Sequence, residues 1–290
     1  MSELTQRDCP HLTRFYAYGS DEGTDMKENS SDNILTYDSV EISYTGKPVV
    51  HDISFTLKKG EILGIVGESG SGKSTIIKAA MRLLGDNGLV TKGDIWFEGM
   101  NLPDISEKQM RELCGPKLGM IFQNAIASMT PIRTVGSQIF ESMREHGEVT
   151  KEEFEKQACD MLKKINLPDG KRVLDSYPFE LSGGMNQRVA ICMAMLMNPK
   201  ILLADEPTSA LDVSVQKRVV EEMVKARDTF GTSIIIVTHN IGVVRAMCDT
   251  CLVLKDGHIM EYGEAKQVIE APRDEYTKQL MDAVPKLKVS

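Results

Sequence analysis

The amino-acid sequence predicts an α/β fold in which a mostly parallel β-sheet is flanked by helices. Two largely apolar runs, "ILLADEP" at 201–207 and "SIIIVTH" at 233–239, lie on either side of a helix-like stretch at 213–231 that mixes charged and apolar residues. An earlier apolar run, "EILGIVG" at 61–67, is also followed by a helix-like stretch. Strands buried on both faces of a parallel sheet are apolar throughout, and crossover helices join them. We therefore expect central strands covered by helices on both faces.

Before the first central strand, the sequence predicts an extension and an antiparallel flap. Residues 1–33 are polar and hold three Lys or Arg against seven Asp or Glu, a net charge of −4, which favours a loosely ordered N-terminal extension. The runs "ILTYDSVEISY" at 34–44 and "VVHDISFTL" at 49–57 are short and strand-like. Their spacing is typical of an antiparallel pair that leads into the buried strand at 61–67.

Helices are expected after this strand. The stretch "STIIKAAMRLLG" at 74–85 favours a helix that its final glycine stops. In the middle of the chain, Thr150 and Glu153 form a capping-box pattern. A further helix is expected over "VAICMAMLMN" at 189–198, before a proline. The apolar residues that follow the capping box at helical spacing, on one face, are Phe154, Ala158, Met161, Leu162 and Ile165.

The composition limits the class of protein. The chain has 290 residues, 41% of them hydrophobic, which is enough for one large domain with attachments or for two small domains. Its net charge of −8 argues against a main affinity for the nucleic-acid backbone, and we expect no nucleic-acid partner. No apolar run approaches the roughly 20 residues that span a bilayer, so a membrane role is expected to come through a partner. The six cysteines favour reduced thiols, and the Cys248-x-x-Cys251 pair lacks a second Cys or His pair for a zinc site.

The segment "GESGSGKS" at 67–74 matches GxxxxGK[ST] between an expected strand and an expected helix. Its glycines would let backbone amides close around phosphate oxygens, and the helix N-terminus adds a favourable dipole. Lys73 is placed to reach β- and γ-phosphates, and Ser74 to ligate Mg²⁺. The alternative is a glycine-rich turn without a ligand. The residues expected to contact a nucleotide here are Gly67, Ser69, Gly70, Ser71, Gly72, Lys73, Ser74 and Thr75.

Two carboxylates and a histidine follow the later apolar runs. Asp205 and Glu206 are expected at the carboxyl end of a strand, where open α/β sheets bind ligands. Asp205 would hold magnesium through its water shell, and Glu206 would orient or deprotonate the attacking water. The alternative is an Asp-Glu-Pro turn that ends a strand. His239 is expected at the same edge, in contact with a γ-phosphate; the alternative is a histidine satisfied within the core.

A second segment, "LSGGMNQR" at 181–188, also has the composition of a phosphate-binding loop. The hydroxyl of Ser182 precedes Gly183 and Gly184, and a helix-forming run follows. One chain does not easily use two such loops on one nucleotide, because the first already has its lysine, its Mg²⁺ ligand and its base. The sequence therefore raises the question of whose phosphate the second loop holds.

In their order and spacing, these segments resemble an ABC-type ATPase subunit. The phosphate loop, "LSGG", "ILLADEP", "SALD" at 209–212 and His239 carry the resemblance, which covers about 36–270. It implies an ABC ATPase domain with a P-loop NTPase core, an antiparallel β subdomain and a helical subdomain. The expected boundaries are 34–255 for the domain, with the core at 34–122 and 186–255, the helical subdomain at about 123–185, and a short C-terminal extension at 256–290.

The resemblance also implies roles for single residues. Tyr44 looks like the aromatic residue that stacks on adenine, with a core tyrosine as the alternative. Gln123 resembles the glutamine that senses magnesium and the lytic water. Asp212 resembles the aspartate that communicates across a dimer. The Ser182–Gly184 segment would face the γ-phosphate bound by the opposite subunit, so that two chains close around shared ATP sites.

Finer features are similar to the oligopeptide, dipeptide and nickel importer branch of this family. They include "YPFELSGGMNQRVAI" and the tail "APRDEYTKQLMDAVP". The resemblance implies a subunit that uses ATP and Mg²⁺ to energise import of peptides or of a nickel or other metal chelate. Its partners would be a second, homologous but non-identical ATPase subunit, two transmembrane permease subunits and an extracytoplasmic solute-binding protein. It would lie at the cytoplasmic face of the cell membrane, held by the permeases.

A non-transport function is the alternative to this interpretation. The same motifs occur in soluble ABC ATPases that act in regulation or assembly. They also occur in an accessory subunit of phosphonate breakdown. Purification with integral-membrane subunits, rather than with soluble enzymes, would separate the two interpretations.

Overall fold

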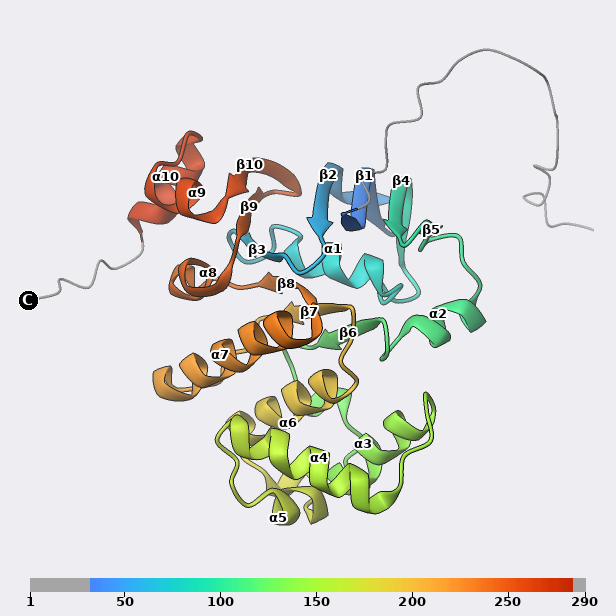
Figure 1. Cartoon of the computed structure of the whole chain (residues 1–290). Helices are drawn as coiled ribbons and strands as arrows, with labels where there is room; N and C mark the ends of the chain where they lie inside the picture. The colour runs from blue at the N-terminus through green and yellow to red at the C-terminus, as the bar shows by residue number, and fades with distance from the viewer. Residues whose placement is uncertain (1–31, 284–290) are drawn as a thin grey trace, which may run out of the picture. The chain divides into compact units, whose positions relative to one another are not determined.

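The structure, a computed structural model, describes residues 32–283. Nearly all of the expected N-terminal extension at 1–33, and the end of the expected C-terminal extension, lie outside the described residues. The described part contains two sheets and a group of helices (Figure 1). One apolar cluster joins the two sheets, and another lies among the helices. No helix in this part is both long and apolar enough to cross a membrane.

The central sheet has six strands in the order β10-β9-β3-β8-β7-β6. All neighbours pair in parallel except β10, which is antiparallel to β9. Every residue of β3, β7 and β8 is buried, as the apolar runs predicted. The bounds are β3 Ile62–Val66, β6 Leu118–Ile121, β7 Ile201–Asp205, β8 Ser233–Val237, β9 Thr250–Lys255 and β10 His258–Glu264. The predicted α/β fold with a mostly parallel sheet is confirmed.

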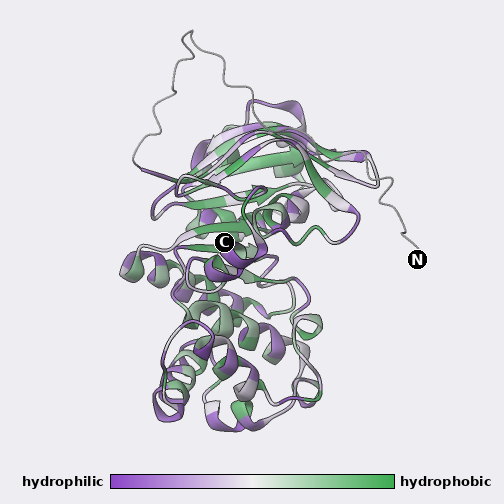
Figure 2. Ribbon diagram, turned by 90° about the vertical axis from the view of Figure 1, so that its right-hand side faces the viewer, coloured by the Kyte–Doolittle hydropathy of each residue, from purple (hydrophilic) through white to green (hydrophobic). Residues whose placement is uncertain are grey.

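Alternate residues of the central strands enter different apolar clusters, so both faces of the sheet are covered. On β8, Ile235 packs with Ile76 of α1 and with the antiparallel sheet, whereas Ile234 packs with Val219 of α7 and Val243 of α8. The covering helices are α1 Lys73–Ala80, α7 Val213–Phe230 and α8 Ile241–Met247. Figure 2 shows apolar residues concentrated along the strands, while the helices alternate between hydrophilic and hydrophobic residues.

A second, antiparallel sheet has the order β2-β1-β4-β5. Its apolar face shares one cluster with α1, and the hydroxyl of Tyr37 donates a hydrogen bond of 2.7 Å to the carbonyl of Ile76. The expected antiparallel pair is therefore present, extended by a third strand and a short fourth one. The bounds are β1 Asn33–Tyr44, β2 Lys47–Lys58, β4 Gly88–Phe97 and β5 Met100–Asn101, and the short helix α2 Glu107–Leu113 follows.

The first helix ends earlier than its sequence predicts. We expected it to reach Gly85, but α1 ends at Ala80. Arg82 adopts a φ of 54°, a left-handed conformation that a right-handed helix does not accommodate. Its guanidinium donates to the carbonyl of Ile105, which holds the side chain beside the start of α2. A tertiary contact therefore accompanies the early end of the helix.

The helices between β6 and β7 pack around an apolar cluster of their own. Thr150 caps α4 as predicted, because its hydroxyl accepts from the amide of Glu153 (3.2 Å) and its amide donates to the Glu153 carboxylate (3.0 Å). The expected helix at 189–198 begins six residues earlier, at Gly183. The bounds are α3 Val135–Arg144, α4 Lys151–Lys164, α5 Gly170–Asp175 and α6 Gly183–Leu196, with 3-10 turns at Ile126–Ser128 and Pro178–Glu180.

Helix α6 joins this helical part to the central sheet. Val189 and Cys192 belong to the cluster of these helices, whereas Ile191 and Met195 belong to the cluster that α7 and α8 form with one face of the central sheet. We propose that the helical subdomain covers about 123–185 and that α6 connects it to the core.

The segment after β9 continues the fold of the central sheet. β10 pairs with β9, and α9 Ala265–Glu270 and α10 Glu275–Asp282 pack in a cluster that includes Val66 at the end of β3. We propose that the described part of the expected C-terminal extension at 256–290, which ends at residue 283, extends the domain at 34–255 and does not form a domain of its own.

Candidate functional site

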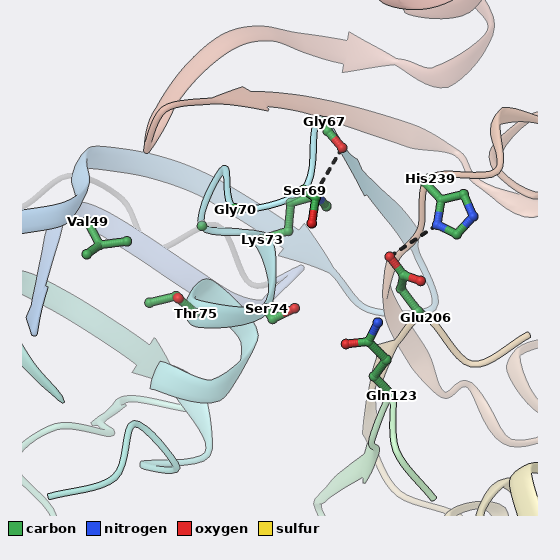
Figure 3. A pocket seen from close by; sticks show the side chains of 11 residues that line it. Val49, Gly67, Ser69, Gly70, Lys73, Ser74, Thr75, Gln123, Glu206 and His239 are labelled. Carbon is green, nitrogen blue, oxygen red and sulfur yellow. Dashed lines mark hydrogen bonds and ion pairs between the residues drawn. The ribbon is translucent and has the colours of Figure 1, made fainter. Parts of the chain in front are cut away.

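The glycine-rich segment at 67–72 connects β3 to α1, as its sequence predicts. Gly67 has a φ of 149°, and a Cβ at this position would lie 2.0 Å from the carbonyl oxygen of Leu254. Gly72 has a φ of 100° and precedes the first residue of α1. Both positions therefore require glycine, because any side chain would be strained or would clash. The loop encloses one side of a cavity of about 430 Å³ (Figure 3).

Lys73 lies inside this loop and is only 7% exposed. Its ammonium donates to the carbonyl of Gly67 (2.9 Å), the carbonyl of Glu68 (2.6 Å) and the hydroxyl of Ser71 (3.4 Å). Burial lowers the pKa of Lys73, and the charges of Glu206, Asp205 and Glu68 oppose this shift. A buried ammonium at the base of a cavity is a strong attractor for an anion such as phosphate.

Ser74 and Asp205 meet at the edge of the central sheet. The Ser74 hydroxyl donates a hydrogen bond of 2.7 Å to the carboxylate of Asp205, the last residue of β7. Asp205 is 2% exposed, and burial raises its pKa while the Ser74 hydrogen bond opposes the rise. A hydroxyl beside a buried carboxylate is an oxygen donor set that suits Mg²⁺, which prefers one or two carboxylates together with phosphate oxygens.

Glu206 and His239 form a contact on the opposite side of the cavity. His239 Nδ1 lies 3.1 Å from Glu206 Oε1 (Figure 3). Glu206 has a φ of 46°, and its amide donates to the carbonyl of Val237 on the adjacent strand. Such left-handed backbone in a non-glycine residue costs about 1–3 kcal/mol and is concentrated at functional sites. The His239 side chain is 67% exposed, so it is not the core histidine of the alternative interpretation.

The structure brings two further side chains to the cavity, and three residues expected in the nucleotide site, Tyr44, Ser71 and Asp205, are not part of its lining. Gln123, which follows β6, lines the cavity as expected. Val49 of β2 also lines it, although a single valine within a strand gave no signal in the sequence. Tyr44 is not among the lining residues; its ring lies close to Gly88, at the start of β4. Its stacking on adenine stays a prediction. The lining residues are Val49, Gly67, Ser69, Gly70, Gly72, Lys73, Ser74, Thr75, Gln123, Glu206 and His239.

The second glycine-rich segment does not line this cavity. The hydroxyl of Ser182 caps α6 and accepts from the amide of Met185 at 3.4 Å. Ser182 and Gly183 are exposed, and a Cβ at Gly183 would meet no atom within 4 Å. Gly184 lies next to the carbonyl of Ala210, just before Asp212. The two segments expected to act across a dimer therefore lie side by side, with an open surface at Gly183.

Asp212 caps α7 with its carboxylate. It accepts from the amides of Ser214 (3.1 Å) and Val215 (3.0 Å), and the hydrogen bond from the Ser214 hydroxyl (2.7 Å) lowers its pKa most. The ordinary function of an N-cap explains these contacts fully. A role across a dimer for Asp212 stays a prediction.

A hydrogen-bonded set that the sequence did not reveal connects the segments after Glu206 and His239. Gln216 of α7 donates to the Thr208 hydroxyl (2.8 Å), and its side-chain oxygen accepts from the side-chain amide of Asn240 (3.4 Å). Gln187 of α6 donates to the carbonyl of Pro207 (3.0 Å) and is 2% exposed. No local pattern marks such residues, because their partners lie on other elements.

The chain is similar to known ABC transporter subunits and ATP-binding cassettes. Residues 50–209 match the family described as ABC transporter. The chain is 42% identical over 234 residues to a probable peptide ABC transporter ATP-binding protein of Sinorhizobium fredii, covering 80% of this chain and 70% of that protein. It is 38% identical over 245 residues to the metal-staphylopine import system ATP-binding protein of Staphylococcus aureus, covering 84% and 90%. A solved dimeric ATP-binding cassette with bound ADP and phosphate superimposes with a TM-score of 0.72 at 28% identity, covering 80% and 98%.

Proposed function

Because this chain belongs to the ABC transporter family, we propose that it is the ATP-hydrolysing subunit of an importer for peptides or for a metal chelate. One observation carries the proposal most directly: a single cavity has a phosphate loop with its buried lysine on one side and a carboxylate–histidine pair on the other. Nucleotide binding and hydrolysis are the shared property of this family.

On the phosphate side, the loop and Lys73 would bind and orient the nucleotide. The backbone amides at the start of α1 and the helix dipole favour an anion there. Lys73 would exchange its bonds to the carbonyls of Gly67 and Glu68 for bonds to the β- and γ-phosphate oxygens. Mg²⁺ fits Ser74 and Asp205, and when bound it would neutralise phosphate charge; Gln123 would complete that site from the segment after β6.

On the opposite side, Glu206 would act on the water that attacks the γ-phosphate. Its carboxylate points into the cavity from the end of β7 and is 18% exposed, so it can accept a proton from a bound water. His239 would hold this carboxylate at 3.1 Å and contact the γ-phosphate, where negative charge moves during transfer. Tyr44 would stack on adenine outside the cavity proper.

The second glycine-rich segment would complete the site of a partner subunit. Ser182, Gly183 and Gly184 lie at the N-terminus of α6, where amides and the helix dipole attract an anion, and the surface at Gly183 is open. Because the chain's own cavity already holds a phosphate loop, the anion would be the γ-phosphate of the opposite subunit. Asp212, beside this surface, would contact that subunit. The solved cassette that this chain resembles is dimeric.

The exposed apolar residues near Gln123 support an interface with permease subunits. Ile126 is 47% exposed and Ile132 is 82% exposed, and both follow the glutamine that lines the cavity. Exposed apolar side chains can mark a protein–protein interface, and a permease docked here would lie beside the nucleotide site. We propose two permease subunits, a second, homologous ATPase subunit and an extracytoplasmic solute-binding protein as partners. The chain would lie at the cytoplasmic face of the membrane, attached through the permeases.

Purification from membranes tests this proposal. A tagged chain is expected to be recovered with two integral-membrane proteins and a second ATPase subunit. The amount of membrane protein recovered with the Ile132→Glu variant should fall at least tenfold, because this variant places a charge on the proposed interface. The variant should still bind ATP. Phe230→Glu is the matched control, since Phe230 is 58% exposed at the far end of α7. If the wild-type chain were recovered only with soluble proteins, and the Ile132→Glu variant with the same soluble proteins, the proposed role in transport would be contradicted.

A further inference from the structure

The segment after the last parallel strand contacts the phosphate loop from outside at two points. The amide of Gly257, in the turn between β9 and β10, donates a hydrogen bond of 3.0 Å to the carbonyl of Ser71. The amide of Glu68 donates a hydrogen bond of 3.2 Å to the hydroxyl of Tyr276 in α10. The first contact is between backbone groups, whereas the second depends on one side-chain oxygen that lies 208 residues away in sequence.

The packing around Tyr276 holds its hydroxyl in place. Tyr276 is 7% exposed and packs in the cluster that contains Val66, the residue before the loop. The Lys255 ammonium lies 4.6 Å from the centre of its ring, within cation–π range. Burial raises the pKa of Tyr276 above its ordinary value. A tyrosine hydroxyl is neutral at physiological pH, and its oxygen can accept a hydrogen bond from an amide.

The start of α10 holds Tyr276 through two acidic side chains. Asp274 caps the helix and accepts from the amides of Tyr276 (2.9 Å) and Thr277 (3.1 Å). The carboxylate of Glu261 on β10 in turn accepts from the amides of Arg273 and Asp274. Charge-assisted bonds of this kind are stronger than neutral ones, so the helix start is fixed relative to β10.

The inner side of the loop depends on Lys73. Its ammonium lies within hydrogen-bond distance of three loop acceptors, namely two carbonyls and, at 3.4 Å, the Ser71 hydroxyl. When Lys73 turns toward phosphate, as proposed above, these bonds weaken. The bonds from Gly257 and to Tyr276 do not involve Lys73 and remain. They are therefore suited to keep the loop open to a nucleotide throughout binding.

We propose that Tyr276 is a positioning residue for the phosphate loop: its hydroxyl accepts the Glu68 amide and holds the loop in the conformation that binds ATP. The C-terminal helix α10 thereby contributes to nucleotide affinity, although none of its residues lines the cavity. This inference rests on the proposed ATP site.

The Tyr276→Phe variant tests it, because it removes one oxygen and keeps the ring. KM for ATP, and Kd for a non-hydrolysable ATP analogue, are expected to rise about two- to tenfold, the effect of losing one neutral hydrogen bond. The value of kcat should stay within about twofold, since the cavity side chains are untouched. Hydrogen exchange at the Glu68 amide should become faster by a similar factor.

Tyr262→Phe is the matched control. The Tyr262 hydroxyl donates a hydrogen bond of 2.9 Å to the carbonyl of Thr56 on β2. The control therefore removes a hydroxyl from the same C-terminal segment, but one that bonds to β2 and not to the phosphate loop. A purely structural role would lower the melting temperature of both variants and leave KM unchanged. Unchanged KM and unchanged exchange at Glu68 in Tyr276→Phe, or a fall confined to kcat, would overturn the inference. If the wild-type protein neither bound nor hydrolysed ATP, the proposed function itself would fail.

Discussion

Replacing Glu206 by Gln is expected to leave ATP binding intact and to lower kcat about 10²- to 10⁴-fold, the range that general base catalysis supplies. Glutamine has nearly the same shape as glutamate, and it can keep a hydrogen bond to His239 in place of the present contact of 3.1 Å. It cannot accept a proton from water. Lys73, Ser74 and Asp205, which hold phosphate and magnesium in the proposal, are unchanged. Single-turnover hydrolysis and equilibrium binding of ATP measure the two effects separately.

Glu221→Gln is a suitable control for this variant. Glu221 is an exposed residue of α7 and does not line the cavity. The Glu221→Gln substitution removes the same charge from the chain as Glu206→Gln, and it should leave kcat unchanged. Near-normal hydrolysis by Glu206→Gln would refute the assignment of Glu206 as the base. A large rise in KM with unchanged kcat would assign it to ATP binding instead.

Ser182→Arg should abolish ATP-driven pairing and turnover, yet leave nucleotide binding by the single subunit within about twofold of the wild type. Ser182 is exposed at the start of α6 and does not line the chain's own cavity. A long, charged side chain there would project toward the opposite subunit and occupy the space of its γ-phosphate. Light scattering with ATP, in the Glu206→Gln background that prevents hydrolysis, measures pairing.

Ser182→Ala distinguishes blocking of the interface from damage to the helix. The Ser182 hydroxyl caps α6, and loss of such a cap costs about 0.5–2 kcal/mol of stability. Both variants lose the cap, but only arginine adds bulk and charge. Equal loss of pairing in the two variants would attribute the effect to the cap. Normal turnover of Ser182→Arg with its partner would show that this segment does not act across the dimer.

The central strands could be predicted from sequence because their burial on both faces makes them continuously apolar. The ends of these strands were predicted less accurately, because β7 and β8 stop at Asp205 and Val237, two residues before the ends of the quoted runs at 201–207 and 233–239. Glu206 leaves the strand with a φ of 46°; the Asp-Glu-Pro sequence is compatible with a turn there, but it does not specify this left-handed conformation. The end of α1 at Ala80 was missed for a similar reason, since Arg82 is held by the distant carbonyl of Ile105.

The sequence by itself determined the phosphate loop, the acidic strand end and the family, because each depends on a few adjacent residues whose backbone requirements are local. Only the tertiary structure decided which side chains meet. The order of β3, β8 and β7 brings Lys73, His239 and Glu206 to one cavity, and it pairs Ser74 with Asp205. The same packing leaves Tyr44 outside the cavity lining. It also places Tyr276 against Glu68, a contact between residues so far apart in sequence that only the folded sheet and its covering helices create it.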